Sequence, residues 1–128
     1  MVVRPQSAPV TPVGAPQHVG YNKATVSATP VLIVNFNSGD HLATCVRSVR
    51  AHAPAAPIVI VDNASSDGSW QVDATAHVAR NPENIGFGRA VNQAFELTAA
   101  GGSPYALLLN PDCRLQAGVL ERLEQELH

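Results

Sequence analysis

The sequence predicts an α/β fold with a doubly wound, mostly parallel sheet, and three observations predict it. Short apolar runs of strand length alternate with stretches in which apolar residues recur at helical spacing. This alternation is typical of a parallel sheet covered by helices. Four of the apolar runs are each followed by a short polar block rich in Asn, Asp and Gly. Because the carboxyl ends of parallel strands meet at one edge of the sheet, the four blocks predict one composite site there.

The four predicted strands are the runs 31–34, 58–61, 76–80 and 105–109. The run 76–80 contains polar residues and predicts a weaker strand, whereas the other three are continuously apolar. Continuous apolar runs are typical of strands that are buried on both faces. The run 105–109 is also the last strand of the chain, so we expect that its outer neighbour is missing.

Helices are predicted between the strands. Ser38 and Asp40 are expected to cap a helix that reaches about residue 51, and residues 65–70 are expected to form a short capped turn. A second helix begins after Gly86 and is expected to end at Gly101 and Gly102. The apolar positions of the three predicted helices are Leu42, Cys45, Val46 and Val49; Phe87, Val91, Ala94, Phe95 and Thr98; and Val119, Leu120, Leu123 and Leu127.

A change in composition near residue 29 predicts the domain organisation. Residues 1–29 contain four prolines among small residues without helical or strand periodicity, which is typical of a disordered or linker tail. Residues 30–128 then form the folded domain. The net charge of −2 gives no electrostatic reason to expect nucleic acid as a partner. No stretch has the length of a membrane span and no secretory signal is visible, so we expect a cytoplasmic protein.

The cysteines and histidines form no recognisable site in the sequence. Cys45 and Cys113 have neither a metal-binding nor a redox spacing, and the five histidines make no metal-ligand pattern. The sequence of residues 63–65 matches an N-glycosylation acceptor, but without a secretory signal we do not expect that modification.

The residue types of the polar blocks favour a nucleotide that carries a diphosphate. Asn and Asp form directional hydrogen bonds with a base or sugar, and Gly allows the backbone to approach a ligand closely. A carboxylate at the end of a strand can hold a divalent cation beside phosphate groups.

In their order and spacing, the blocks 35–39, 62–68, 80–92 and 110–112 resemble the amino-terminal half of family 2 glycosyltransferases, especially the rhamnosyltransferase-like branch. The resemblance covers residues 30–123 and implies a glycosyltransferase A fold, of which the chain would be a truncated donor-binding half. It further implies that a sugar is transferred, with inversion, from a uridine or thymidine diphospho-sugar to a hydroxyl of a saccharide or lipid-linked acceptor. Mg²⁺ or Mn²⁺ is the implied cofactor. Peripheral membrane association of the full protein and self-association stay open.

The resemblance also assigns roles to individual residues. The carboxylate of Asp62 would accept a hydrogen bond from the ring nitrogen of uracil or thymine, and Asp112 would bind the metal. The simpler alternatives are that Asp62 caps the turn that begins at Ser65 and that 110–112 is an ordinary β-turn. The general base is not identifiable. The complete set of implied donor-binding residues is Asn37, Asp62, Asn63, Arg80, Asn84, Gly86, Asn92 and Asn110.

Two other functions are weighed against this one. A non-catalytic nucleotide-binding fragment or interaction module would need no acceptor half. A dinucleotide-binding oxidoreductase would use the glycines at 86 and 88, but Val91 stands where its third glycine or alanine is required. For Asn84 a capping role, and for Arg89 a simple surface position, are the alternatives to ligand binding.

Overall fold

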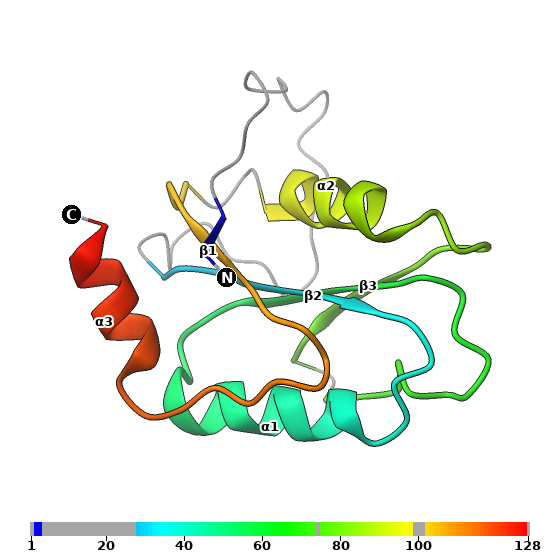
Figure 1. The fold of residues 1–128 in the computed structure, drawn as a ribbon, viewed down its shortest axis with the longest axis horizontal. Helices are drawn as coiled ribbons and strands as arrows, with labels where there is room; N and C mark the ends of the chain where they lie inside the picture. Colours follow the sequence, from blue (N-terminus) through cyan, green and yellow to red (C-terminus); the bar gives the residue numbers. More distant parts are fainter. Residues whose placement is uncertain (1, 4–27, 74, 99–101, 128) are drawn as a thin grey trace.

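The computed structural model describes residues 2–3, 28–73, 75–98 and 102–127, which form a three-layer α/β unit (Figure 1). Its elements are β1 (Val2–Val3), β2 (Val31–Asn35), α1 (His41–His52), β3 (Ile58–Asp62), β4 (His77–Arg80), α2 (Phe87–Thr98), β5 (Ala106–Leu108) and α3 (Val119–Glu126). The four predicted strands and the three predicted helices are all present, each within a few residues of its predicted bounds.

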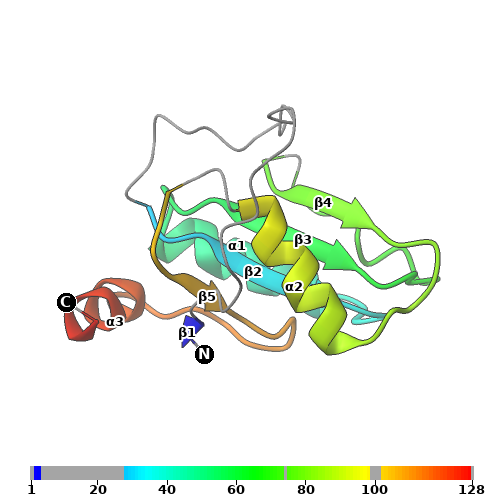
Figure 2. The same ribbon diagram turned by 90° about the horizontal axis from the view of Figure 1, so that it is seen from above.

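The sheet has the order β1-β5-β2-β3-β4, with the four longer strands parallel to one another (Figure 2). In the longest pairing, β2 and β3 run side by side from Val31 opposite Ile58 to Asn35 opposite Asp62. Chain order and strand order differ, because β5 lies beside β2 at the centre of the sheet. The predicted doubly wound, mostly parallel sheet is therefore confirmed.

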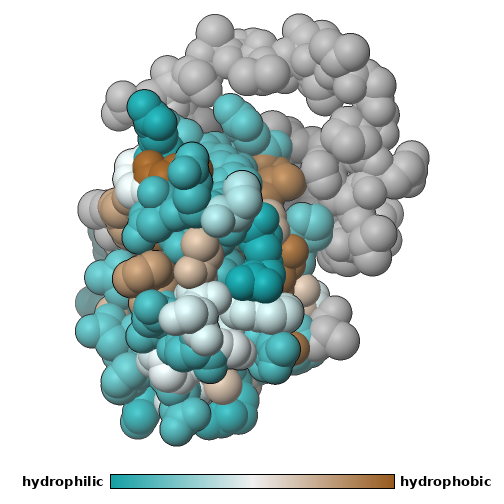
Figure 3. Space-filling model, turned by 90° about the vertical axis from the view of Figure 1, so that its right-hand side faces the viewer, coloured by the Kyte–Doolittle hydropathy of each residue, from teal (hydrophilic) through white to brown (hydrophobic). Residues whose placement is uncertain are grey.

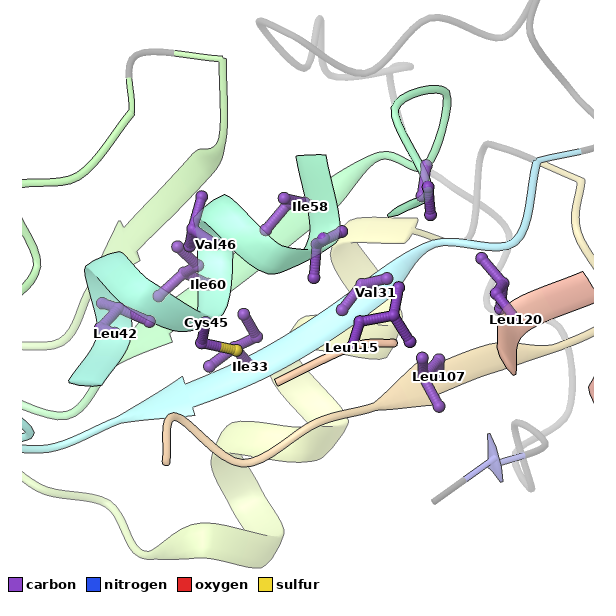
Figure 4. Packing of buried hydrophobic residues seen from close by; sticks show 13 residues of the cluster. Val31, Ile33, Leu42, Cys45, Val46, Ile58, Ile60, Leu107, Leu115 and Leu120 are labelled. Carbon is purple, nitrogen blue, oxygen red and sulfur yellow. The ribbon is translucent and has the colours of Figure 1, made fainter. Parts of the chain in front are cut away.

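Alternate residues of each strand point to opposite faces of the sheet, and a different helix covers each face. Ile33 and Ile60 pack against the apolar face of α1, where the thiol of Cys45 is directed at the sheet (Figure 4). Leu32 and Val61 belong to the second core cluster, which α2 covers from the other side (Figure 1). The strands are apolar at consecutive positions because both faces are buried.

The expectation that the last predicted strand, which is β5, lacks an outer neighbour is wrong. Val2 and Val3 of β1 pair antiparallel with β5, so that Val2 lies opposite Leu107 and Val3 opposite Ala106. The side chain of Val2 also packs against the core. A two-residue strand has no periodicity that a sequence pattern can reveal, so β1 was not predicted. The rest of the predicted tail up to residue 27 lies outside the described residues.

Several details of the helices also differ from expectation, and two of the four predicted apolar positions of the last helix, Val119 and Leu127, are each 38% exposed. Neither Ser38 nor Asp40 caps α1 with its side chain, because the Ser38 hydroxyl donates to Asn35 Oδ1 and Asp40 makes no capping hydrogen bond. Phe87, a predicted core position of α2, is 52% exposed, and Ala90 occupies the core in its place. The predicted end of α2 at Gly101 lies outside the described residues. In the described part of the chain, no helix is long and apolar enough to cross a membrane.

Candidate functional site

Three polar side chains stand in a row at the carboxyl ends of adjacent strands. The register places Asn35 at the end of β2 opposite Asp62 at the end of β3, and Asp62 opposite Arg80 at the end of β4. All three strands point towards the face in Figure 3, on which hydrophilic side chains predominate. The sequence placed Asn35 in the polar block after its strand, whereas the structure makes it the last residue of β2; Asp62 is the last residue of β3.

Asp62 is fully buried and its carboxylate is held from three directions. Oδ1 accepts a hydrogen bond from Asn35 Nδ2 at 2.9 Å. Oδ2 accepts from the backbone N–H of Ser65 at 3.0 Å and from Arg80 Nε at 3.3 Å. A buried carboxylate needs such donors to offset its desolvation. The proposed turn-capping contact with Ser65 is thus present. That Asp62 binds the nucleobase of a donor stays a prediction. Because its side chain is 0% exposed, such binding requires a local movement.

Arg80 connects the buried carboxylate with the surface. Its Nη2 donates to the backbone oxygen of Ser65 at 3.2 Å, and its guanidinium carbon lies 4.0 Å from the ring centroid of Trp70. The side chain is 43% exposed. Trp70 was not predicted to belong to the site, although the only tryptophan of the chain lies in the turn after Asp62. Stacking on this ring fixes the guanidinium above the row of strand ends.

The polar blocks after β2 and β3 are locked to each other. The backbone N–H of Asn37 donates to Ser65 Oγ at 2.9 Å, and Asn37 Oδ1 accepts from the N–H of Ser66 at 2.8 Å. Asp67 bridges the same two blocks, since its Oδ2 accepts from Gly39 N–H and its Oδ1 from Ser69 N–H, both at 2.9 Å. The hydrogen bonds from Ser69, followed by the one from Gly39, lower the pKa of Asp67 below its usual value.

Asn63 uses its amide group inside the protein. It is 2% exposed, its Nδ2 donates to the backbone oxygen of Gly86 at 3.2 Å, and its Oδ1 accepts from Asn81 Nδ2 at 3.0 Å. Asn84 is exposed, and its Oδ1 accepts from the N–H of Gly86 at 2.9 Å, which closes a local turn before α2. Asn92 is exposed on α2. This geometry brings Asn63, Asn84 and Gly86 together beside the row of strand ends.

The fourth polar block lies next to the start of α1. The backbone oxygen of Asn110 accepts from Cys113 N–H at 3.0 Å and from the Cys45 thiol at 3.7 Å. Asp112 is exposed, and the Cys113 thiol approaches its Oδ1 at 3.8 Å. Within the described ranges, no hydrogen bond or ion pair joins Asp112 to Asp62 or Arg80. The structure therefore brings three of the four blocks into direct contact and leaves the fourth at their side.

The acidic residues do not form a closed metal site. Among the described residues, no group of three or more His, Cys, Asp or Glu side chains could hold a metal ion. Asp112 offers one exposed carboxylate. Mg²⁺ in phosphate-binding sites is commonly held by one or two carboxylates together with phosphate oxygens of the ligand. Asp112 therefore fits a cation that is shared with a bound diphosphate, and does not fit a cation held by protein alone.

Comparison with known proteins identifies a family. The family model described as Glycosyl transferase family 2 matches residues 31–128. No curated protein matches the chain at a significant level. The matched region includes β2–β5, the three helices and all four polar blocks, and its parallel sheet is consistent with a nucleotide-binding half of the glycosyltransferase A type. The chain therefore belongs to glycosyl transferase family 2.

Proposed function

We propose that the chain is the donor-binding part of an inverting glycosyltransferase of the rhamnosyltransferase-like branch. Its donor would be a uridine or thymidine diphospho-sugar, and its acceptor a hydroxyl of a saccharide or lipid-linked compound. The observation that carries this proposal is the buried Asp62 in register between Asn35 and Arg80 at the carboxyl edge. A charged group at that place is costly for stability, and such costs are common at functional sites.

We assign Asp62 to recognition of the nucleobase of the donor. Uracil and thymine carry an imide N–H, which a carboxylate can accept and which adenine lacks. Among the described residues Oδ1 receives a single donor, so it retains acceptor capacity. Arg80, which is partly exposed and lies above Oδ2, is the side chain whose displacement would open the carboxylate to the imide.

The diphosphate would lie between the turn at Asn84 and Gly86 and the carboxylate of Asp112. Asn37, Asn92 and Asn110 are all exposed and supply further polar groups around the sugar and phosphates. A bound Mg²⁺ or Mn²⁺ would supply Lewis-acid stabilisation of the negative charge that develops on the leaving diphosphate. Asp112 is the residue that would hold the cation, together with phosphate oxygens.

The proposed reaction is a direct displacement. The acceptor oxygen forms a bond to the anomeric carbon on the face opposite the nucleotide, the bond to the diphosphate oxygen breaks, and the configuration inverts. The acceptor proton passes to a general base, a role that we assign to none of the described residues.

Calorimetric titration with a set of nucleotides in the presence of Mg²⁺ tests the proposal. Uridine or thymidine diphosphate should bind more tightly than adenosine diphosphate or NAD. Asp62→Ala should lose this preference by about tenfold or more, because a hydrogen bond with a charged group is worth roughly 1.5–3 kcal/mol. Asp73→Ala is a matched control, since Asp73 is an exposed carboxylate outside the four polar blocks. Equal or tighter binding of NAD would refute the proposal.

A second candidate function is a nucleotide-binding module without turnover. The complete burial of Asp62 and its three protein donors favours it, because these contacts hold the carboxylate without any ligand. Release of free sugar from a uridine diphospho-sugar, followed by chromatography, separates the two functions. Hydrolysis that Asp112→Asn abolishes supports the enzyme, whereas pyrimidine-selective binding without hydrolysis or transfer supports the module.

A further inference from the structure

The side chains of Gln93, Asn81 and Asn63 form a continuous series of hydrogen bonds, which we call the amide chain. Gln93, in the middle of α2, exchanges two hydrogen bonds with Asn81, each 2.9 Å long. Asn81 Nδ2 also donates to Asn63 Oδ1 at 3.0 Å. Asn63 Nδ2 then donates to the backbone oxygen of Gly86 at 3.2 Å. The amide chain thus runs from the body of α2, by way of the ends of β4 and β3, to the turn that precedes α2.

Two members of the amide chain are sheltered from water, and Gln93 is half-buried. Asn63 is 2% exposed and Asn81 is 9% exposed. Buried amide groups are costly unless they are hydrogen-bonded, and a buried network with its bonds formed restricts the protein to one arrangement. Hydrophobic residues could fill the same space without this requirement. The network is therefore better explained by the arrangement it enforces than by the stability it adds.

The amide chain determines the position of the turn at Gly86. Its backbone oxygen accepts both from Asn63 and from the N–H of Ala90 at 3.2 Å, in the first turn of α2. The N–H of Ile85 lies 3.4 Å from Asn63 Oδ1. The backbone N–H of Asn81 donates to the oxygen of Asp62 at 2.8 Å. The amide chain therefore fixes the turn and the start of α2 relative to the end of β3.

We propose that Asn81 and Gln93 are positioning residues for the donor. They hold the turn at Asn84 and Gly86 at the separation from Asp62 that the base and the diphosphate of one nucleotide require. The inference rests on the proposed function, which assigns the base to Asp62 and the diphosphate to this turn. Nothing in the sequence motif marks Gln93 for such a role, since the neighbouring Asn92 is the residue that the family resemblance implies.

The readout that isolates positioning is the ratio of the affinities for uridine diphosphate and uridine, measured by NMR titration in Mg²⁺. Gln93→Met keeps the length of the side chain and removes both hydrogen bonds to Asn81. We expect this ratio to fall about tenfold, while the affinity for uridine changes by less than about twofold. Gln125→Met, at an exposed position of α3, is the control and should leave both affinities unchanged.

Gln93→Glu keeps the test decisive even where Gln93→Met does not fold. A protonated carboxyl group has one donor and one acceptor and can replace the amide opposite Asn81, whereas the carboxylate has acceptors alone. Because an ordinary glutamate ionises with a pKa of about 4.3, the affinity ratio, relative to the unmodified protein at the same pH, should recover towards normal at about pH 3.5. At pH 8 it should be lowered about tenfold.

Two results would overturn the inference, and they can be told apart. If folded Gln93→Met and Gln93→Glu keep the normal ratio at every pH, or lose affinity for uridine and for the diphosphate equally, the amide chain is a structural feature alone. If the unmodified protein binds no uridine diphosphate, the proposed function fails, and the inference fails with it.

Discussion

Asn35 and Asp62 end two adjacent strands and lie directly opposite each other, with Asn35 Nδ2 donating to Asp62 Oδ1 at 2.9 Å. Both side chains are completely buried. The same Asn35 nitrogen lies 2.9 Å from Ser69 Oγ and 3.3 Å from Ser65 Oγ. Asn35 therefore links the carboxylate of β3 to the turn that follows it.

Removal of this link should destabilise the fold. Asn35→Ala takes a donor from a buried carboxylate, so the free energy of unfolding should fall by roughly 2–3 kcal/mol. Urea denaturation followed by circular dichroism measures the change. Asn92→Ala, at an exposed position, is the control and should change stability by less than about 0.5 kcal/mol. Equal effects of the two substitutions would show that the link contributes little.

Asp67 should make stability depend on pH in the acidic range. Its pKa is lowered from the ordinary 3.8 by hydrogen bonds from Ser69 and Gly39. Its contribution is therefore fully present above about pH 4 and is lost as the pH falls through the lower pKa of the folded state. We expect Asp67→Asn to unfold at lower urea than the unmodified protein at pH 7, with the difference shrinking towards pH 2. A difference that grows on acidification would contradict this assignment.

The two cysteines should react very differently with thiol reagents. Burial, followed by the charges of Cys113 and Asp112, raises the pKa of the Cys45 thiol to about 12, whereas Cys113 is exposed. Because the thiolate is the nucleophile, iodoacetamide at pH 7.5 should modify Cys113 and leave Cys45 unmodified until the protein unfolds. Peptide mass spectrometry in native buffer and in urea measures both sites. Rapid modification of Cys45 in native buffer would show that α1 does not protect it.

Divalent cations should strengthen nucleotide binding through Asp112. We expect Mg²⁺ or Mn²⁺ to raise the affinity for uridine diphosphate and Asp112→Asn to abolish the increase, because the cation needs both the carboxylate and the phosphates. Asp67→Asn should retain the increase. Titration calorimetry of the unmodified protein and of Asp112→Asn, each with added cation and with chelator, gives the four affinities needed. If chelator leaves the affinity of the unmodified protein unchanged, Asp112 is not a metal ligand.

Most of the fold could be predicted from the sequence because its signals are local. Continuous apolar runs mark strands buried on both faces, and helical spacing marks the stripe of α1 that contains Cys45 and Val49. The short β1 could not be predicted, because its two residues are placed only by pairing with β5. The prediction that Ser38 caps α1 was wrong for a similar reason, because its hydroxyl donates to Asn35 across the turn instead.

The candidate site was predicted in part. The rule that ligands bind at the carboxyl ends of parallel strands located the polar blocks. It could not separate residues that face the ligand from residues that hold the blocks together. Asn63 is turned inwards to Gly86 and Asn81, and Trp70 supports Arg80, through contacts that depend on chain segments far apart in the sequence. Such tertiary hydrogen bonds and ring contacts leave no periodic signal.

The most direct test of the composite site is an NMR titration of the ¹⁵N-labelled protein with uridine diphospho-sugar in Mg²⁺. We predict that the backbone amide shifts concentrate in the four polar blocks, residues 35–39, 62–68, 80–92 and 110–112. The same titration with adenosine diphosphate should produce much smaller shifts at equal concentration. Shifts confined to α3 or to the opposite edge of the sheet, or no shifts at millimolar ligand, would contradict a nucleotide-sugar site at the carboxyl ends of these strands.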